Sequence, residues 1–523
     1  MNMPKQTNAY KYSFIVAIGG LIFGLDAALI SGTINFITKE FALSDIQLGT
    51  AVSAPALGVL LALPFAGYAC DKFGRKKTLI IVAFLYLFSA IFSALAPNYF
   101  TLVAARFIGG LAFSSISLAS MYIGEIAPPK LRGKLVSMTQ INIVIGLSAA
   151  YFINYLILDW STATSGWAVD YGLTTNVWRW MLGSEIIPAL IWFLLLFTIP
   201  ESPSWYLLKN RKEEATKVLT NLMPLTEIPK YVNENLERIH SKTKELSIVE
   251  QLKGVFTKRM RVILIIATTI AIAQQATGIN AILFYAPTVF EQLGLGTDAA
   301  FAQAIWIGLV SIVFTILAIL LVDRLGRRPM IIAGMLWIVA SLVLCWYGFS
   351  LAEYSLTPEA LIALKDVPNI EQLNNLVGVV YDSDLAFKNA LAENLGEATA
   401  RDYAGVFLEK CTTLNATLIL VGLLSFIGAF HFSVGPLMWV LFSEIFPVSI
   451  RGIAIPFFTI ITSLTNWLVQ QFFPWQLNNM GVGAIFLFYA SIVAIGLIIL
   501  SIYLKETKGL TIEEIQKTLQ GNK

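Results

Sequence analysis

The hexapeptide DKFGRK at Asp71–Lys76 recurs as DRLGRR at Asp323–Arg328, 252 residues further along the chain. A second stretch, GLDAAL at Gly24–Leu29, recurs as GINAIL at Gly278–Leu283, with a similar offset of 254 residues. Internal similarity at a nearly fixed offset indicates that one structural unit is duplicated within the chain. The sequence therefore predicts two homologous halves.

A third repeated segment shows that the second half carries an insertion. EIAPPKLRG at Glu125–Gly133 recurs as EIFPVSIRG at Glu444–Gly452, and here the offset grows to 319 residues. The extra length matches the polar segment 351–412, which interrupts the apolar runs of the second half. This segment holds ten acidic and four basic residues and is predicted to form short surface helices.

The composition places both halves in a membrane. Of 523 residues, 57% are hydrophobic and 13% are charged, whereas soluble domains carry about 25% charged residues. This balance, with a net charge of +3, excludes a large soluble enzyme, a disordered hub and a nucleic-acid binder. A spanning helix needs about 20 apolar residues. The predicted fold class is all-α and integral to the membrane, with twelve spans at 11–36, 48–69, 76–96, 99–121, 135–158, 178–199, 261–290, 300–322, 329–350, 415–442, 452–473 and 482–504.

Lysine and arginine set the expected orientation, because they accumulate in cytoplasmic loops. They gather at 72–77, 130–134 and 324–328, whereas the short loops on the opposite side hold almost none. We therefore expect both termini on the cytoplasmic side of the cell's inner (plasma) membrane. The predicted units are an N-terminal six-helix half at 1–200, a cytoplasmic helical linker at 201–258, and a C-terminal half at 259–523 with an extracytoplasmic insertion at 351–412.

Asp26 is the most informative single residue, because it lies inside the first predicted span. An ionisable group in hydrocarbon costs at least ~2.5–3.5 kcal/mol, so it normally faces a cavity and finds a partner. At 1.5 Å per residue, Arg106 and Glu185 lie at a similar depth, roughly 10–15 Å below the outer face. Two ionised acids and one arginine leave one negative charge, which favours uptake of a proton. We interpret the three residues as a proton-coupling cluster; a static ion pair is the alternative.

Side-chain amides form a second signal inside the spans. They donate and accept hydrogen bonds, which suits the hydroxyl groups of a sugar or another polyol. They lie in the fifth, seventh and eleventh spans: Gln140, Gln274, Gln275, Asn280 and Asn466. In the tenth span Trp439 can stack on an apolar sugar face, and the preceding Gly435 and Pro436 are expected to break the helix. Hydrogen bonding between helices is the alternative role of the amides.

Charged residues recur at the cytoplasmic end of both halves. They are Asp71, Arg75, Glu125, Arg132 and Glu201 in the first half, and Asp323, Arg327, Glu444, Arg451 and Glu506 in the second. We interpret them as an intracellular latch, in which Arg–carboxylate pairs between helices hold the inner side shut in the outward-open state. Each exposed pair contributes little by itself, so the network would act as a whole. Anchoring of positive loops in the cytoplasm is the alternative.

No catalytic or cofactor site is predicted. The two histidines, His240 and His431, and the three scattered cysteines lack metal-ligand spacing. His431 lies in the tenth span and is an alternative proton site, although we expect a satisfied helical histidine. There is no P-loop, nucleophile elbow or metal motif. We therefore expect no enzymatic activity, no metal, no cofactor and no ATP-driven transport.

Six motifs together point to one family: Gly67–Lys76, Tyr122–Pro128, Pro200–Trp205, Gln274–Asn280, Gly435–Trp439 and Glu506–Gly509. From about Ile18 to Glu514, apart from the insertion, the chain resembles the sugar porters of the major facilitator superfamily. In pattern it is similar to bacterial proton-coupled monosaccharide symporters of the xylose type. The resemblance implies a central site in which the amides and Trp439 hold sugar hydroxyls.

The resemblance also implies roles for single residues. Asp26 matches the proton-linked aspartate of the symporters, Arg106 matches its partner, and Glu185 matches a second acid. Tyr285 matches an outer-gate tyrosine. The implied function is monosaccharide:proton symport by alternating access, by a functional monomer.

Several positions depart from the xylose-type pattern. Leu147, Ser311 and the stretch Thr462–Leu464 replace polar residues that are usual there. The sugar is therefore left open between a hexose and a pentose. A facilitative sugar uniporter and a proton-coupled inositol or polyol transporter are the alternatives.

Overall fold

The computed structural model describes residues 3–128, 131–242, 248–510, 514–515 and 518. Within them, twelve helical spans are long and apolar enough to cross a membrane, as predicted. The first six are α1 (Met3–Glu40), α2 (Asp45–Phe73), α3 (Arg75–Ala94), α4 (Tyr99–Ala112) with α5 (Ser115–Ile126), α6 (Arg132–Ser161), and α8 (Val177–Gly183) with α9 (Ile186–Leu195) and η1 (Leu196–Thr198). The last six are α14 (Arg261–Gln275) with α15 (Ile279–Phe284) and α16 (Ala286–Glu291), α17 (Thr297–Leu325), α18 (Arg327–Ser350), α23 (Ala416–Phe432) with α24 (Val434–Ile445), α25 (Val448–Asn479) and α26 (Val482–Tyr503).

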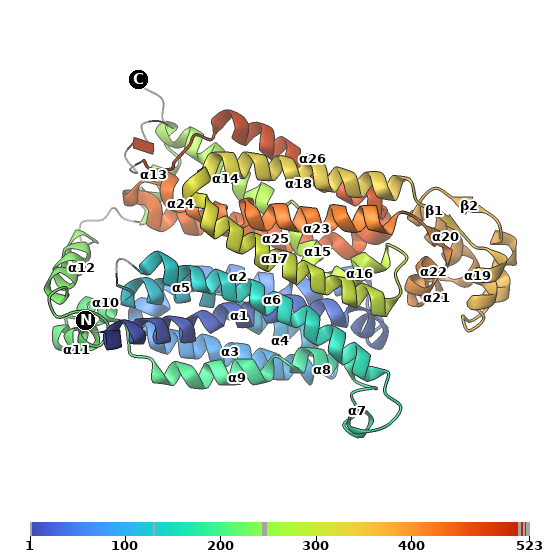
Figure 1. The fold of residues 1–523 in the computed structure, drawn as a ribbon, viewed down its shortest axis with the longest axis horizontal. Coiled ribbons are helices and arrows are strands. Elements are labelled where there is room, and N and C mark those ends of the chain that lie inside the picture. The colour runs from blue at the N-terminus through green and yellow to red at the C-terminus, as the bar shows by residue number, and fades with distance from the viewer. Residues whose placement is uncertain (1–2, 129–130, 243–247, 511–513, 516–517, 519–523) are drawn as a thin grey trace.

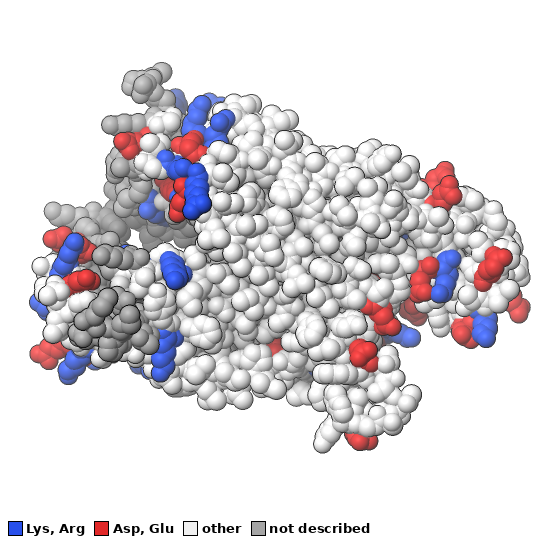
Figure 2. Space-filling view, viewed as in Figure 1, with Lys and Arg blue, Asp and Glu red and all other residues white. Residues whose placement is uncertain are grey.

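The two sets of six spans lie side by side, the first set blue to green and the second green to red in Figure 1. The helices that connect the sets, the start of α1 and the end of α26 lie at one end, which we call the linker end. The insertion lies at the opposite end, which we call the insertion end. Figure 2 shows charged side chains gathered at these two ends and a broad belt between them almost without charge. Such a belt is what contact with lipid requires, because charged side chains are costly there.

Two spans are interrupted where the sequence disfavours a continuous helix. In the seventh, α14 ends at Gln275, and Gly278 adopts a left-handed conformation (φ 79°) before α15 begins. Glycine suits this conformation because it has no Cβ atom. In the tenth, α23 ends at Phe432, and Gly435 and Pro436 lie in the first turn of α24. The break predicted from this pair is confirmed, since proline cannot continue the hydrogen-bonding pattern of the preceding helix.

The linker between the sets is helical. It contains α10 (Pro203–Leu208), α11 (Lys212–Thr220), α12 (Ile228–Lys242), α13 (Ile248–Val255) and η2 (Lys258–Met260). Its apolar faces form a small core of Leu207, Ala215, Leu219, Met223, Ile228, Tyr231 and Val232. The Tyr231 hydroxyl donates to the backbone carbonyl of Glu125 (2.6 Å), which attaches α12 to the first half. Further along, α13 packs against α25 of the second half.

The insertion contains a small sheet as well as helices. The helices of the insertion are α19 (Pro358–Ala363), η3 (Ile370–Leu376), α20 (Asp384–Leu395), α21 (Glu397–Asp402) and α22 (Ala404–Cys411). The short helix α7 (Trp167–Asp170) belongs instead to the first half. The central strand β1 (Glu353–Ser355) pairs antiparallel with β2 (Val380–Tyr381) and β3 (Thr412–Thr413). The predicted short helices are present, whereas the sheet was not predicted. Strands of two or three residues are too short to show an alternating pattern, and their partners lie far apart in sequence.

The two halves contact each other closely at the insertion end. A Cβ atom on Gly49 of α2 would lie 2.0 Å from the carbonyl oxygen of Gln471 in α25, so the two backbones touch. The Gln471 side chain accepts from Ser53 Oγ (2.9 Å) and donates to the carbonyl of Ile46 (2.9 Å). Among the described residues, the side-chain hydrogen bonds that connect one half with the other lie at this end. The structure is therefore closed at the insertion end.

Candidate functional site: a charged cluster and an amide cluster

A buried ion pair lies in the first half, between α1 and α4. Asp26 Oδ1 is 3.5 Å from Arg106 Nη1, and both residues are almost fully buried. Arg106 Nε also donates to the carbonyl oxygen of Ala51 in α2 (3.0 Å), so the guanidinium joins three helices. Asp26 Oδ2 is buried and has no hydrogen-bond partner among the described residues. The Asp26 carboxyl group therefore keeps one buried oxygen whose hydrogen-bonding capacity is not used by a described residue.

Glu185 adds a second carboxyl group to this pair. It lies between α8 and α9, is 4% exposed, and interacts electrostatically with Asp26 and Arg106. The buried Tyr86 of α3 interacts electrostatically with both acids. Its hydroxyl is 3.4 Å from Ser115 Oγ. The structure therefore brings together the three residues that the sequence placed at a similar depth. Their role in proton coupling stays a prediction.

Amide side chains of the seventh and eleventh spans form a hydrogen-bonded chain. Asn280 Nδ2 donates to Gln275 Oε1 (2.8 Å) and to Asn466 Oδ1 (2.6 Å). Gln470 Nε2 donates to the same Asn466 oxygen (2.6 Å). Gln470 was absent from the predicted set, although its position four residues after Asn466 on one helix signals that they are neighbours. These four side chains, which we call the amide chain, join α14, α15 and α25.

The other predicted sugar ligands have different surroundings. Gln274 is 5% exposed, and its Oε1 atom has no hydrogen-bond partner in the described part of the chain. Trp439 in α24 is 45% exposed and meets Phe442 edge to face. Gln140 in α6 is half-buried. A buried, unpaired amide oxygen can accept a ligand hydroxyl, and an accessible indole face can stack on an apolar ring face. Sugar binding by these residues stays a prediction.

Tyr285 lies between α15 and α16 and is buried. Its hydroxyl donates to the backbone carbonyl of Gln470 (3.1 Å), and its ring centre is 5.1 Å from that of Phe473. Tyr151 of α6 reaches from the first half to the second, where its hydroxyl donates to the carbonyl of Leu283 (2.6 Å). Sequence reasoning missed Tyr151, because a tyrosine inside an apolar span carries no local signal. The gate role of Tyr285 stays a prediction.

A further buried acid, Glu291, joins the halves at the insertion end. Glu291 of α16 is 5% exposed and accepts hydrogen bonds from Asn35 Nδ2 of α1 (2.9 and 3.1 Å). It also accepts from Thr297 Oγ1 (3.2 Å). Sequence reasoning missed this contact, since Asn35 and Glu291 both lie at the ends of spans, where polar residues are ordinary.

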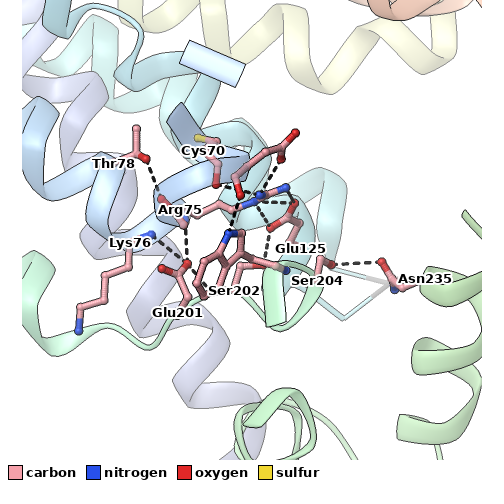
Figure 3. A network of polar contacts seen from close by, with 12 residues as sticks. Cys70, Arg75, Lys76, Thr78, Glu125, Glu201, Ser202, Ser204 and Asn235 are labelled. Atoms are coloured by element: carbon pink, nitrogen blue, oxygen red, sulfur yellow. Dashed lines mark hydrogen bonds and ion pairs between the residues drawn. The ribbon is translucent and has the colours of Figure 1, made fainter. Parts of the chain in front are cut away.

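Arg75 is the centre of a charged network at the linker end of the first half (Figure 3). Its Nη2 atom is 2.9 Å from Glu125 Oε1, and its Nη1 atom is 3.0 Å from Asp71 Oδ1. Glu201 Oε1 accepts from the backbone N–H groups of Arg75 (2.8 Å) and Lys76 (3.0 Å). The network ties α2, α3 and α5 to the start of the linker.

The second half repeats this arrangement. Arg327 Nη2 is 3.0 Å from Glu444 Oε1, and its Nη1 is 3.0 Å from Asp323 Oδ1. Glu506 accepts from the backbone N–H groups of Arg327 and Arg328 (both 3.0 Å). Partial burial opposes the charged form of Glu506, but hydrogen bonds from four backbone N–H groups outweigh it and hold its pKa below the ordinary 4.5. The duplicated sequence has therefore produced a duplicated network.

Two predicted members of the latch stand apart from these networks. Arg451 donates to the backbone carbonyl of Phe446 (2.9 and 3.3 Å). Neither Arg451 nor Arg132 forms an ion pair with a described residue. In the present state, which is closed at the insertion end, the described latch residues form ion pairs between helices of the same half. None of these pairs joins one half to the other. Closure of the linker end by this set stays a prediction.

The described residues contain no group of three or more His, Cys, Asp or Glu side chains that could hold a metal ion. His431 is buried, with Nδ1 3.3 Å from Thr315 Oγ1. Its Nε2 atom has no partner within the described ranges, so the histidine is only half satisfied.

Comparisons with known proteins match most of the chain to one family. The family model described as "Sugar (and other) transporter" matches residues 12–357 and 403–519. The arabinose-proton symporter of Bacillus subtilis is 31% identical over 523 residues, covering 99% of this chain and 97% of that protein. The D-xylose-proton symporter of Escherichia coli K12 is 30% identical over 541 residues, covering 97% of this chain and 95% of that protein.

A solved structure has the same fold. The inward-open conformation of the xylose transporter from E. coli aligns with a TM-score of 0.71 and 28% identity, covering 98% of this chain and 100% of that one. This likeness, together with the twelve candidate spans among the described residues, confirms the predicted fold class.

Proposed function

Because the chain belongs to the sugar transporter family of the major facilitator superfamily, we propose that it carries a monosaccharide together with a proton across a membrane. Transport proceeds by alternating access, in which a central site opens first to one side and then to the other. The protein performs no chemistry on the sugar and is not an enzyme. The names of its relatives, which are symporters of arabinose and of xylose, support this function.

The observation that carries the proposal is the composition of the buried charged cluster. Asp26 is paired with Arg106, Glu185 interacts electrostatically with both, and Asp26 Oδ2 lacks a hydrogen-bond partner among the described residues. One proton on Asp26 Oδ2 would balance the charge of the cluster and change that oxygen from an acceptor into a donor. It would also weaken the attraction that holds Arg106 in place, because a neutral carboxyl group is a poorer partner for a cation.

Sugar binding is proposed at the amide chain. Asn280, Gln275 and Asn466 can each exchange a mutual hydrogen bond for one to a sugar hydroxyl. Gln274 and Gln140 add further amides, and Trp439 offers an accessible ring face. An array of amides recognises hydroxyl groups without a charge, which fits a neutral hexose or pentose.

The moving bodies are proposed to be residues 1–200 and 259–523, joined by the helical linker 201–258. Rocking of one body against the other would open the insertion end and close the linker end. The latch residues are proposed to close the linker end in that second state. Arg132 and Arg451 suit this role, since neither holds a carboxylate among the described residues in the present state.

We place the linker end in the cytoplasm and the insertion end outside an inner (plasma) membrane, with both termini cytoplasmic. The basic segments at 72–77 and 324–328 support this orientation. Each half completes its own charged network, and the proposed site lies within one chain. The functional unit is therefore proposed to be a monomer, without a nucleic-acid partner.

The function is tested by measuring external pH in lightly buffered, de-energised cells that express the protein. Glucose, galactose, xylose, arabinose and inositol are added in turn. Alkalinisation of the medium on addition of one sugar, absent from the Asp26→Asn variant, is the expected result. If labelled sugar enters downhill without any pH change, the protein is a uniporter and the Asp26–Arg106 pair is structural. A response to inositol alone would assign it to polyols.

A further inference from the structure

The insertion is a folded unit with its own core. Its strands and helices pack around side chains that are almost fully buried, among them Tyr354, Leu373, Phe387, Leu391 and Phe407. The family model matches the chain up to residue 357 and again from 403, so most of this unit lies outside the shared family pattern. A packed unit of this kind holds the residues on its surface in defined positions.

The insertion is attached to the second half by more than its two chain connections. Asp384 Oδ1 accepts from the backbone N–H of Val482 at the start of α26 (3.3 Å). Lys388 Nζ donates to Gln292 Oε1, just beyond α16, and to Asp384 Oδ2 (both 3.0 Å). These contacts fix α20 to the seventh and twelfth spans. The insertion therefore moves with the second half.

One ion pair reaches from the insertion to the first half. Arg401 in the last turn of α21 places Nη2 2.6 Å from Asp45 Oδ1, and Asp45 is the first residue of α2. The same oxygen accepts from Asn478 Nδ2 at the end of α25 (2.9 Å). Asp45 is thus held by two groups of the second half, and it lies four residues before Gly49, where α2 and α25 touch.

We propose that the insertion is a clasp on the outer gate, which docks Arg401 onto Asp45 and thereby favours the state closed at the insertion end. The inference rests on the proposed alternating access, because opening of this end separates the two bodies that carry Asp45 and Arg401. The Asp45 and Arg401 side chains are 18% and 36% exposed. A pair this exposed shifts an equilibrium by up to about fivefold, and added salt weakens it.

The first test measures opening of the insertion end and needs no sugar. In a background without Cys70, Cys345 and Cys411, a single cysteine replaces Ser53. This residue of α2 is fully buried against Gln471 of α25. Arg401→Gln is expected to raise the labelling rate of this cysteine by an external, membrane-impermeant maleimide two- to fivefold. Unchanged labelling would overturn the clasp while leaving symport untouched.

The matched control places the cysteine at Ser89 instead. Ser89 is buried against Gly109 of the same half, so a change between the halves does not expose it. Its labelling rate is expected to be the same with and without Arg401→Gln.

A double variant tests whether Arg401 acts through Asp45. Asp45→Asn keeps an acceptor for Asn478 but removes the charge. Asp45→Asn, Arg401→Gln and the double variant should raise the labelling of the Ser53→Cys reporter by the same factor, because each removes one shared interaction. Effects that multiply in the double variant would show that the two residues act independently, and would contradict the proposal.

Reversible cross-linking tests whether the contact must break during transport. Arg401→Cys with Asp45→Cys, joined by a short bifunctional methanethiosulfonate reagent, should lose sugar exchange and regain it on reduction. The control pair, Lys388→Cys with Gln292→Cys, lies within the second half and should keep exchange when joined. Failure of the first pair to cross-link, or full exchange after it has cross-linked, would overturn the clasp.

Discussion

Arg106 binds Asp26 of α1 at 3.5 Å and, through Nε, the carbonyl oxygen of Ala51 in α2 at 3.0 Å. Ala51 lies two residues from Gly49, where α2 meets the backbone of α25. The guanidinium thus connects the acid proposed to carry the proton with the helix that seals the insertion end. A change of charge on Asp26 can therefore reach the contact between the halves through one side chain.

Asp26→Asn is expected to abolish sugar accumulation and to retain exchange. The amide cannot bind and release a proton, so the membrane potential no longer drives uptake. One charge moved across 100 mV supplies about 2.3 kcal/mol, which sustains an about 50-fold ratio of internal to external sugar concentration. In the variant this ratio should fall to one. Accumulation and exchange of labelled sugar in energised vesicles measure both quantities. Asp159→Asn, at an exposed position of α6, is the control and should accumulate normally. Retained accumulation by Asp26→Asn would contradict proton coupling at this residue.

Gln274→Ala is expected to weaken sugar binding. Its buried Oε1 atom has no partner within the described residues, so a sugar hydroxyl is the group that would satisfy it. Loss of one hydrogen bond costs about 0.5–1.5 kcal/mol, so the half-saturating sugar concentration should rise about two- to tenfold, with a smaller change in the maximal rate. Initial uptake rates over a range of sugar concentrations measure this. Gln372→Ala, exposed on the insertion, makes the same chemical change away from the amide chain and should leave the half-saturation unchanged.

Gly49→Ala is expected to prevent closure of the insertion end. The new Cβ atom would lie 2.0 Å from the Gln471 carbonyl oxygen, and a backbone atom cannot move aside cheaply. Sugar should still bind from the outside, whereas uptake and exchange should fall strongly. Gly183→Ala is the matched control, since its Cβ would meet its nearest neighbour at an ordinary 3.6 Å. Equal transport by both variants would show that α2 and α25 need not touch during the cycle.

Glu506→Gln is expected to destabilise the protein at neutral pH and to matter less in acid. The pKa of Glu506 is below 4.5 in the folded state, because backbone N–H groups outweigh the effect of burial. Its charge therefore adds stability above pH 4.5, which is lost as the pH falls through the lowered pKa. The group is only partly buried, so solvent screening limits the gain to at most about 1 kcal/mol. Thermal unfolding in detergent should show a gap between wild type and variant at pH 7 that narrows below pH 4.5. Glu359→Gln, exposed on α19, controls for the substitution itself.

Much of the fold was predictable because its signals are local or repeated. Twelve apolar runs mark twelve spans, and the repeats at Asp71–Lys76 and Asp323–Arg328 mark two halves. The position of Asp26 inside a span indicated a buried partner, and depth alone selected Arg106. The sheet of the insertion was not predictable, since β1 pairs with strands that are only two residues long.

The amino-acid sequence by itself determined the spans, the duplicated charged networks and the types of side chain available to the site. These follow from hydropathy, from spacing along single helices and from internal similarity. Only the tertiary structure decided that Gln470 joins Asn466, that Glu291 meets Asn35, and that Arg401 reaches Asp45. The last two contacts join segments more than 250 residues apart, which no local pattern records. They also belong to one of two arrangements of the same halves, so packing between the bodies, and not any single helix, selects them.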